Sequence, residues 1–275
     1  MSDRPFVSLT TDFGTAYTAI CAGVVHRLAP EATVLVLDDD VTPYAVVEGA
    51  LLLRQGLLYL PVGVHVGVVD PGVGTARRPV AIATGRGDVL VGPDNGLLIP
   101  AADELGGVTR AHVLEDPAYR LPNVSTSFHG RDIFSPAAAH LARGLDVAAL
   151  GPSAEPETLV RLPLPDPVVS AGRLDAPVLY ADRFGSLILA ADRDDLVTAL
   201  GTLQYGDPLE LGWTDADGAP RTERLAFAAT YGGVAEGGAL VWVDSSGLLG
   251  VAVNQGSAVA RFGRPASFVF RTGVT

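Results

Sequence analysis

Short runs of β-branched and aliphatic residues alternate with longer amphipathic stretches along the first half of the chain. The short runs predict strands and the longer stretches predict helices. The predicted order is strand, helix, strand, helix, strand, over residues 6–10, 17–28, 32–37, 45–60 and 64–69. This alternation is typical of a mainly parallel sheet with helices on both faces.

The same half contains a predicted hairpin and a further helix. Residues 80–84 and 89–91 are apolar runs separated by Gly85-Arg86-Gly87-Asp88, a turn sequence that favours an antiparallel pair. Residues 133–143 have helical periodicity. We therefore expect the α/β pattern to continue beyond the fifth element.

Prolines at positions 152, 156, 163, 165 and 167 interrupt both kinds of pattern. Proline lacks a backbone donor and ends helices and ladders, so this stretch is typical of a domain boundary. We predict an N-terminal α/β domain over residues 1–162, a Pro-rich linker over 163–171 and a second domain over 172–275.

The second half consists of short strands separated by turn signals such as Asp217-Gly218 and Ser246-Gly247. The predicted strands cover residues 177–180, 186–189, 209–211, 239–243 and 250–253. Strands at this spacing predict a small antiparallel barrel or sandwich. The predicted fold class is α/β followed by all-β.

Composition and charge exclude several classes of protein. The chain has 275 residues and is 48% hydrophobic, but Gly, Pro or charged residues interrupt every apolar run before the ~18 residues that a membrane helix needs. A formal charge of −12 argues against a nucleic-acid partner, because phosphates would be repelled. The start of the chain lacks a signal-peptide pattern, so we expect a cytoplasmic protein. The single cysteine, Cys21, is interpreted as a core residue.

Two candidate carboxylates follow predicted strands, where ligands collect in open parallel sheets. Asp12 follows the first strand and fits either a helix N-cap or a ligand for the two hydroxyls of a ribose. Asp70 follows the third strand, and a Gly-rich turn brings Arg77 back toward it. This pair fits either a structural ion pair or part of a catalytic site.

Two further segments carry candidate residues. His129 lies between flexible residues ahead of the 133–143 helix, and Asn95 lies in the turn Gly92-Pro93-Asp94-Asn95-Gly96. His129 fits either a core histidine or a proton-transfer group, and Asn95 fits either a plain turn or a ligand contact. The chain lacks the spacings of zinc, calcium and serine-hydrolase motifs, so we predict no metal.

Five motifs occur in an order that resembles a known family. They are T-D-F-G-T at 11–15, T-P-Y at 42–44, V-D-P-G-V-G-T-A-R at 69–77, P-D-N-G-L-L at 93–98 and F-H-G-R-D at 128–132. Together they resemble the S-adenosylmethionine hydroxide adenosyltransferases, relatives of the fluorinases and chlorinases, over residues 6–262. The resemblance implies a C-terminal β-barrel, a homotrimer with active sites between subunits, and hydrolysis of S-adenosylmethionine to adenosine and L-methionine without a cofactor.

The resemblance also implies roles for individual residues. The catalytic set that activates water is Asp70, Arg77 and His129. The substrate-binding residues implied for the first domain are Asp12, Tyr44 and Asn95. Those implied for the barrel are Asp182, Ser186, Tyr231, Ser245 and Asn254, with the backbone near Gln255.

Several positions depart from the family pattern. Tyr17 and Asp39 stand where the family usually has Asp and His, and Ser186 stands where its barrel motif usually has Asn. Ala190 departs nearby. Three alternatives therefore stay open: a module that binds adenosine or S-adenosylmethionine without turnover, a purely structural trimer, and a halide-transferring relative. Halogenating relatives carry Tyr at the positions of Asp70 and His129, so the pattern here favours water as nucleophile.

Overall fold

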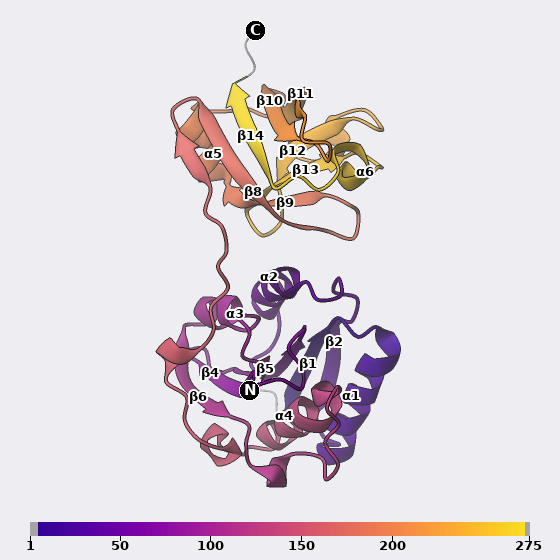
Figure 1. Cartoon of the computed structure of the whole chain (residues 1–275), viewed down its shortest axis with the longest axis vertical. Coiled ribbons are helices and arrows are strands. Elements are labelled where there is room, and N and C mark those ends of the chain that lie inside the picture. The colour runs from indigo at the N-terminus through magenta and orange to yellow at the C-terminus, as the bar shows by residue number, and fades with distance from the viewer. Residues whose placement is uncertain (1–4, 273–275) are drawn as a thin grey trace. The chain divides into compact units, whose positions relative to one another are not determined.

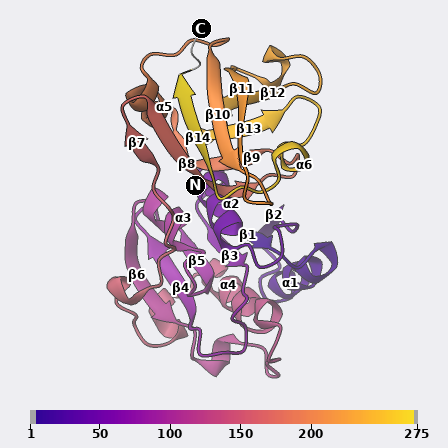
Figure 2. The same ribbon diagram turned by 45° about the horizontal axis from the view of Figure 1, so that its top comes forward.

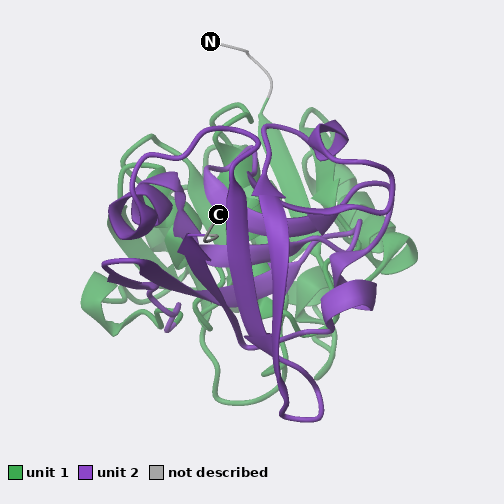
Figure 3. Ribbon diagram, turned by 90° about the horizontal axis from the view of Figure 1, so that it is seen from above, with its two compact units in different colours: residues 1–162 green, residues 163–275 purple. Residues whose placement is uncertain are grey.

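The computed structural model describes residues 5–272. The chain divides into two compact units, residues 1–162 and residues 163–275, which Figure 3 colours separately. Part of the stretch predicted as a linker, Val168–Ser170, forms strand β7 and pairs with the next strand. Among the described residues, no helix is long and apolar enough to cross a membrane.

Unit 1 is built on a six-stranded sheet with the order β2-β1-β3-β5-β4-β6 (Figures 1 and 2). Neighbours within β2-β1-β3-β5 run parallel, whereas β4 runs antiparallel to both β5 and β6. The expected mainly parallel sheet and the β4–β5 hairpin are confirmed. The strands are β1 (Phe6–Thr11), β2 (Thr33–Asp38), β3 (Val64–Val68), β4 (Pro79–Thr84), β5 (Val89–Pro93) and β6 (Val108–Val113).

Helices cover both faces of this sheet, as predicted. One face packs against α1 and α4, and the other packs against α2 and α3. These helices are α1 (Thr15–Leu28), α2 (Val46–Leu57), α3 (Ile99–Glu104) and α4 (Ser135–Ala142). Short turns complete the unit: η1 (Pro117–Tyr119), η3 (Val147–Leu150) and η4 (Pro156–Thr158).

Two local predictions in unit 1 have definite outcomes. Cys21 is 2% exposed on α1, which confirms it as a core residue, and burial raises the pKa of its thiol to about 11 against the opposing hydrogen bond from Ser135. The helix predicted over 133–143 instead begins as a π-helical turn, η2 (Gly130–Phe134), which runs directly into α4. Such π turns have one residue more per turn, and periodicity does not reveal them.

Unit 2 is a closed seven-stranded barrel. Its strands follow the order β14-β10-β11-β12-β13-β9-β8, with β14 pairing back onto β8 and β7 added outside. They are β8 (Arg173–Ala181), β9 (Leu187–Asp192), β10 (Pro208–Thr214), β11 (Pro220–Phe227), β12 (Ala239–Val243), β13 (Leu248–Val253) and β14 (Ser267–Thr272). The short helices are α5 (Arg193–Leu200), α6 (Ala258–Phe262) and η5 (Tyr231–Gly233).

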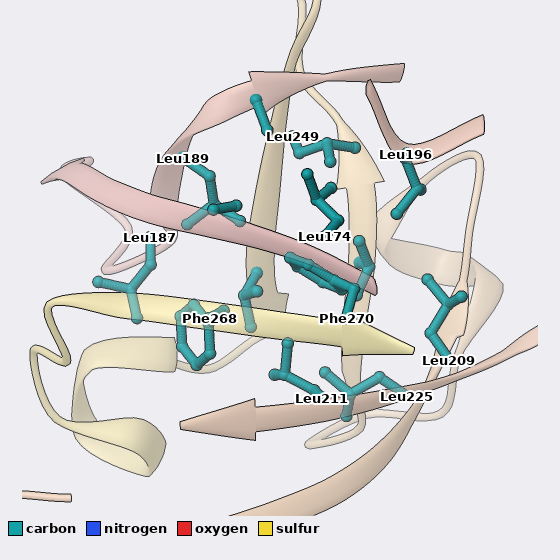
Figure 4. Close-up of a cluster of buried hydrophobic side chains, with 14 of the residues drawn as sticks. Leu174, Leu187, Leu189, Leu196, Leu209, Leu211, Leu225, Leu249, Phe268 and Phe270 are labelled. Atoms are coloured by element: carbon teal, nitrogen blue, oxygen red, sulfur yellow. The ribbon is translucent and has the colours of Figure 1, made fainter. Parts of the chain in front are cut away.

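The interior of the barrel confirms an all-β second half. Leucine side chains from many strands meet Phe268 and Phe270 inside it (Figure 4). Most neighbouring strands run antiparallel as expected, but β11 and β12 pair in parallel. The prediction missed β11 because its first residues, Pro220-Arg221-Thr222-Glu223, are polar and largely exposed, so its apolar alternation is weak.

Candidate functional site

The loops that follow β1 and β3 leave the sheet at the same edge. These strands are parallel neighbours, and Thr11 at the end of β1 is opposite Val68 at the end of β3. Asp12 is the first residue after β1, and Asp70 is the second residue after β3. The carboxyl ends of parallel strands form the crevice where ligands bind in α/β sheets, so both carboxylates are placed where chemistry is expected.

The loop after β3 folds back on itself through tight turns. The amide of Val73 donates to the carbonyl of Asp70 at 3.2 Å, and the amide of Thr75 donates to that of Gly72 at 3.2 Å. Gly74 has φ +77°, and a Cβ there would lie 2.5 Å from the carbonyl oxygen of Thr126. Glycine is therefore required for this loop to approach the segment that leads to His129.

This return brings Arg77 into contact with both other members of the predicted catalytic set. Its Nε donates to Asp70 Oδ1 at 3.2 Å, and its Nη2 donates to Asp70 Oδ2. The same Nη2 lies 3.1 Å from His129 Nδ1. The side chains of Asp70 and Arg77 are only 4% and 7% exposed. Asp70, Arg77 and His129 thus form one contiguous group, which we call the catalytic cluster after the role predicted for it.

The contact with Arg77 determines the tautomer of His129. A guanidinium has donors and no acceptor, so Nδ1 of the imidazole must accept this hydrogen bond. The proton of the neutral ring is therefore on Nε2. Burial lowers the pKa of His129, the nearby Arg77 lowers it further, and Asp70 acts in the opposite direction. The site thus favours a neutral imidazole that donates through Nε2.

Close packing at Gly130 and hydrogen bonds to Asp132 hold the backbone around His129. Gly130 begins the π turn, and a Cβ there would lie 2.7 Å from the Phe13 ring. Asp132 is fully buried and accepts from Arg131 Nε at 2.6 Å and from the amide of Ser125 at 2.8 Å. Burial would raise the pKa of Asp132, but these donors lower it, so the carboxylate stays charged.

A cavity of about 350 Å³ lies beside the catalytic cluster. It is formed entirely by residues of unit 1. The lining residues are Asp12, Phe13, Pro43, Tyr44, Val68, Asp70, Val73, Ser127, Phe128, His129 and Gly130. Sequence reasoning did not single out Phe13 and Phe128, whose rings meet edge to face at 5.6 Å. Their signal was their place inside D-F-G and F-H-G-R-D, and apolar aromatic rings commonly line the pockets that bind small molecules.

Asp12 and Tyr44 meet at the rim of this cavity. The amide of Tyr44 donates to Asp12 Oδ2 at 3.0 Å. Tyr44 has φ +68°, which is unusual for a residue with a side chain, and the side chain is largely exposed. Asp12 therefore stabilises the turn that presents Tyr44, and its Oδ1 is the oxygen with no hydrogen bond to that turn.

Asn95 is placed differently from the other predicted binding residues of unit 1. Its Nδ2 donates to the carbonyl of Val69 at 2.8 Å, and its Oδ1 accepts from the amide of Leu97 at 3.1 Å. Asn95 is not among the residues that line the cavity. Both ends of its amide hold backbone, including the residue that precedes Asp70.

In unit 2, three of the predicted binding residues gather at one place. Asp182 Oδ1 accepts from the amides of Phe184 at 2.9 Å and Ser186 at 2.7 Å. Tyr231 shares a hydrogen bond with Ser186, and its pKa is raised by burial and by the negative charge of Asp182, against the effect of that bond. Asp182, Ser186 and Tyr231 thus form a second polar group.

The remaining predicted residues of unit 2 lie in turns. Asn254 donates from Nδ2 to the carbonyl of Val234 at 2.9 Å, and Gln255 after it has φ +53°. Ser245 is exposed in the turn between β12 and β13, where Asp244 Oδ1 accepts from the amides of Ser246 and Leu248. The negative charge of Asp244 also raises the pKa of Tyr231, and sequence reasoning did not single out Asp244.

No cluster of three or more His, Cys, Asp or Glu side chains with the geometry to hold a metal occurs in the described part of the chain, residues 5–272. The candidate site therefore consists of an ion-paired cluster beside a mixed polar and aromatic cavity. It can orient a small polar molecule, donate a hydrogen bond from a neutral imidazole and accept a proton on a carboxylate.

Two family models match the chain. Residues 7–151 match the SAM hydroxide adenosyltransferase N-terminal domain, and residues 176–266 match the C-terminal domain of that family. A protein of Salinispora tropica named (R)-S-adenosyl-L-methionine hydrolase is 46% identical over 96% of this chain and 95% of its own length. A fluorinase of Actinopolyspora mzabensis is 26% identical, with 94% of each chain covered.

A solved structure has the same fold. An uncharacterized conserved protein from Thermotoga maritima superposes with a TM-score of 0.85 at 29% identity, covering 96% of this chain and 99% of that one. The likeness therefore extends over both units and is not confined to the sheet that carries the catalytic cluster.

Proposed function

The chain belongs to the SAM hydroxide adenosyltransferase family, and from that premise we propose that it hydrolyses S-adenosyl-L-methionine to adenosine and L-methionine. The family expected from the five motifs is confirmed by the two family models. The hydrolase relative is far more similar to this chain than the fluorinase is, at 46% against 26% identity. The structural observation that carries the proposal is the convergence of Asp70, Arg77 and His129 beside one cavity.

The name of the hydrolase relative specifies the configuration of the sulfonium. It is an (R)-S-adenosyl-L-methionine hydrolase. We include this preference in the proposal, because inversion at sulfur moves the methyl and aminocarboxypropyl groups relative to the ribose. A site that aligns C5′ and sulfur for one epimer does not align them for the other, and alignment is a large part of the barrier.

The chemical step needs an activated nucleophile and no general acid. The oxygen of water forms a bond to C5′, the C5′–S bond breaks, and its electron pair stays on sulfur as the neutral thioether of methionine. One proton of the water must leave as the bond forms. Bulk water has a pKa of about 15.7, so the site has to provide a proton acceptor.

Asp70 is the residue that we assign as this acceptor. His129 Nδ1 is engaged with Arg77, so the neutral ring donates through Nε2 and is not free to take a proton. Asp70 lines the cavity, while Arg77 holds its two oxygens in a defined orientation. Arg77 stays charged throughout and stabilises the carboxylate before transfer. His129 then orients the water by donating to its oxygen.

We assign the substrate-binding roles according to the family and the cavity. Asp12 binds ribose hydroxyls, and Tyr44, Phe13 and Phe128 contact the nucleoside, which is supported by their place in the lining. The polar group of unit 2, formed by Asp182, Ser186 and Tyr231, binds the remaining parts of the substrate. Its support is the set of hydrogen-bonding groups gathered around Asp182.

A direct assay tests the proposed reaction. The purified protein is incubated separately with the (R) and (S) epimers of S-adenosyl-L-methionine, and adenosine and methionine are quantified by chromatography. We expect equal amounts of both products, formed faster from the (R) epimer. An Asp70→Ala variant is the control, and adenosine formation no faster than with that variant would show the proposal to be wrong.

Calorimetry and the same product assay, run with chloride present, distinguish the two alternatives in which a nucleoside is bound. Tight binding by calorimetry with no product over hours would indicate a module that only binds. A chloride-dependent 5′-halogenated nucleoside would indicate halide transfer. We expect neither, because the carboxylate of Asp70 at the cavity repels an incoming anion and accepts a proton from water.

We further propose that the chain assembles as a homotrimer in which neighbouring copies complete each active site, as the family resemblance implies. This is supported by apolar side chains exposed on the edge strand β2, Leu35 at 38% and Val36 at 41%. An unpaired apolar edge is typical of an interface. Light scattering should give three times 28.4 kDa, and a monomeric mass would contradict the assembly. A cytoplasmic location stays a prediction.

A further inference from the structure

An ion pair outside the cavity joins the two ends of the β4–β5 hairpin. Arg78 precedes β4 and Asp94 follows β5, and the last paired residues of these strands are Pro79 and Pro93. Arg78 donates to Asp94 Oδ2 from Nε at 2.8 Å and from Nη2 at 2.5 Å. The amide of Asp94 in turn donates to the carbonyl of Arg78 at 2.9 Å. We call this pair the clasp.

The clasp also binds the segment that ends unit 1. Asp94 Oδ1 accepts from the amide of Val160 at 2.8 Å. Arg78 Nη2 donates to the carbonyl of Thr158 at 2.6 Å, and its Nη1 donates to Thr158 Oγ1 at 3.2 Å. Every polar atom of the two side chains thus has a protein partner. The side chain of Asp94 is only 4% exposed, so its charge depends on these partners.

Each residue of the clasp is adjacent in sequence to a residue that acts on Asp70. Arg77 precedes Arg78 and holds both oxygens of the Asp70 carboxylate. Asn95 follows Asp94 and holds the carbonyl of Val69, one residue before Asp70. The side chain and the backbone at Asp70 are therefore held from two directions, and both supports start from the clasp.

We propose that Arg78 and Asp94 are positioning residues for the proposed hydrolysis, acting on Asp70 through Arg77 and Asn95. This inference rests on the proposed function. The turns of the loop between β3 and β4 bond it to itself, and Arg78 is the residue that joins Arg77 at the end of this loop to the paired strands β4 and β5. Misplacement of a reacting group by about 1 Å can cost about 10²-fold in rate, so a support outside the cavity can control turnover.

The decisive variant is Asp94→Asn, which keeps the size of the side chain and an oxygen for the amide of Val160 but removes the charge that holds Arg78. We expect kcat to fall about tenfold or more with KM changed less than about twofold, because the substrate contacts are untouched. Arg78→Lys keeps the positive charge but loses the guanidinium, whose several nitrogens donate to Asp94 and Thr158 together. Its kcat should therefore lie between those of Asp94→Asn and the unchanged protein.

Asp103→Asn is the matched control. It removes an Asp–Arg pair with Arg161 in the same unit, at 2.8 Å, whose side chains are 47% and 60% exposed. We expect its kcat to equal that of the unchanged protein. If Asp94→Asn lowers only the melting temperature and leaves kcat at the level of Asp103→Asn, the clasp is purely structural and the proposal is wrong.

A spectroscopic measurement separates this proposal from the proposed reaction. The Nε–H of Arg77 donates to Asp70, and its ¹H–¹⁵N signal reports that contact whether or not the protein turns over substrate. In Asp94→Asn and Arg78→Lys we expect this signal to move toward that of a free arginine and to exchange faster with solvent. An unchanged signal in both folded variants would overturn the positioning role, whereas absent turnover in the unchanged protein would overturn only the reaction.

Discussion

Unit 1 contains two groups of Asp, Arg and His at different places in the sheet. The catalytic cluster lies beyond the carboxyl ends of β1 and β3, beside a cavity. The second group, hereafter the buried cluster, lies near the amino ends of β1, β3 and β5. Its members are Ser8, His65, Arg86 and Asp88.

The buried cluster uses the same chemical groups without access to a ligand. Ser8 Oγ lies 2.8 Å from His65 Nδ1, and His65 Nε2 lies 3.0 Å from Asp88 Oδ1. The side chains of His65 and Asp88 are 0% exposed. Burial would raise the pKa of Asp88, but hydrogen bonds from His65, Arg86 and the amide of Gly63 hold it well below its ordinary value.

The difference between the clusters shows that the presence of Asp, Arg and His side chains in contact does not by itself indicate a catalytic site. In the buried cluster every ring nitrogen and carboxylate oxygen is already bound to protein, so the cluster can only stabilise the fold. In the catalytic cluster Arg77 holds Asp70 and His129 in place while both also line a cavity. Access to a cavity, rather than residue type, distinguishes the two clusters.

The largest effect should follow from Asp70→Asn, which removes the proposed proton acceptor of the catalytic cluster. We expect kcat to fall by about 10²–10⁴-fold, the usual contribution of a general base, with a much smaller change in substrate affinity. Rapid-quench assays give kcat, and calorimetry gives affinity. If substrate affinity fell by as large a factor as kcat, Asp70 would be a substrate-binding residue and not the proton acceptor.

The second-largest effect should come from the buried cluster, where a substitution should lower stability and leave turnover unchanged. Asp88→Asn leaves Arg86 without its charged partner, and we expect the free energy of unfolding in urea to fall by about 3 kcal/mol. Turnover per folded molecule should stay the same. The exposed pair of Asp103 and Arg161 supplies the control, since Asp103→Asn should cost less than about 1 kcal/mol. If folded Asp88→Asn turned over substrate more slowly, the buried cluster would also contribute to turnover, and the prediction would be wrong.

His129→Ala should produce a smaller loss of turnover than Asp70→Asn. Because the imidazole is proposed only to donate to the water, we expect kcat to fall by about 10²-fold, the low end for the loss of one hydrogen-bond donor, and affinity to change little. His129→Asn, which can also donate, should recover part of this loss. If His129→Ala and Asp70→Asn lowered kcat by the same factor, His129 would also take part in accepting the proton, contrary to the role assigned to it. Nitrogen NMR should find the ring proton on Nε2.

The smallest effect should be in the pH dependence. The pKa of His129 is lowered below 6.5, so the neutral ring persists as the pH falls through 6.5 and kcat should stay flat there. Stability from Asp88, whose pKa is lowered, is complete above its ordinary value of 3.8 and is lost only as the pH falls through the folded value. A kcat decline centred at 6.5 would contradict the environment assigned to His129.

Much of the fold was predictable because its signals are local. Apolar periodicity predicted β1, α1, β2, α2 and β3 to within a few residues. The strands β6, β7, β11 and β14 were missed. In β6 and β11 the exposed positions are mostly polar or charged, so no continuous apolar run marks these strands. The π turn ahead of α4 was missed because its extra residue leaves no trace in composition.

The candidate site was predictable in membership and not in arrangement. Motif order brought Asp70, Arg77 and His129 together as candidates, and the structure places them in contact. The same reasoning expected Asn95 to contact the ligand, but its amide holds Val69 and Leu97. It gave no sign of the clasp, since Arg78 and Asp94 meet only after two strands pair.

The sequence by itself determined the alternation of strands and helices, the all-β second half and the family, because each is written in short-range pattern and motif order. Only the tertiary structure decided which Asp and His residues line the cavity, which nitrogen of His129 carries the proton, and what Asn95 holds. These depend on burial and on hydrogen bonds between residues far apart in the chain. A side chain has the same chemistry at every position, and its neighbours in space decide how that chemistry is used.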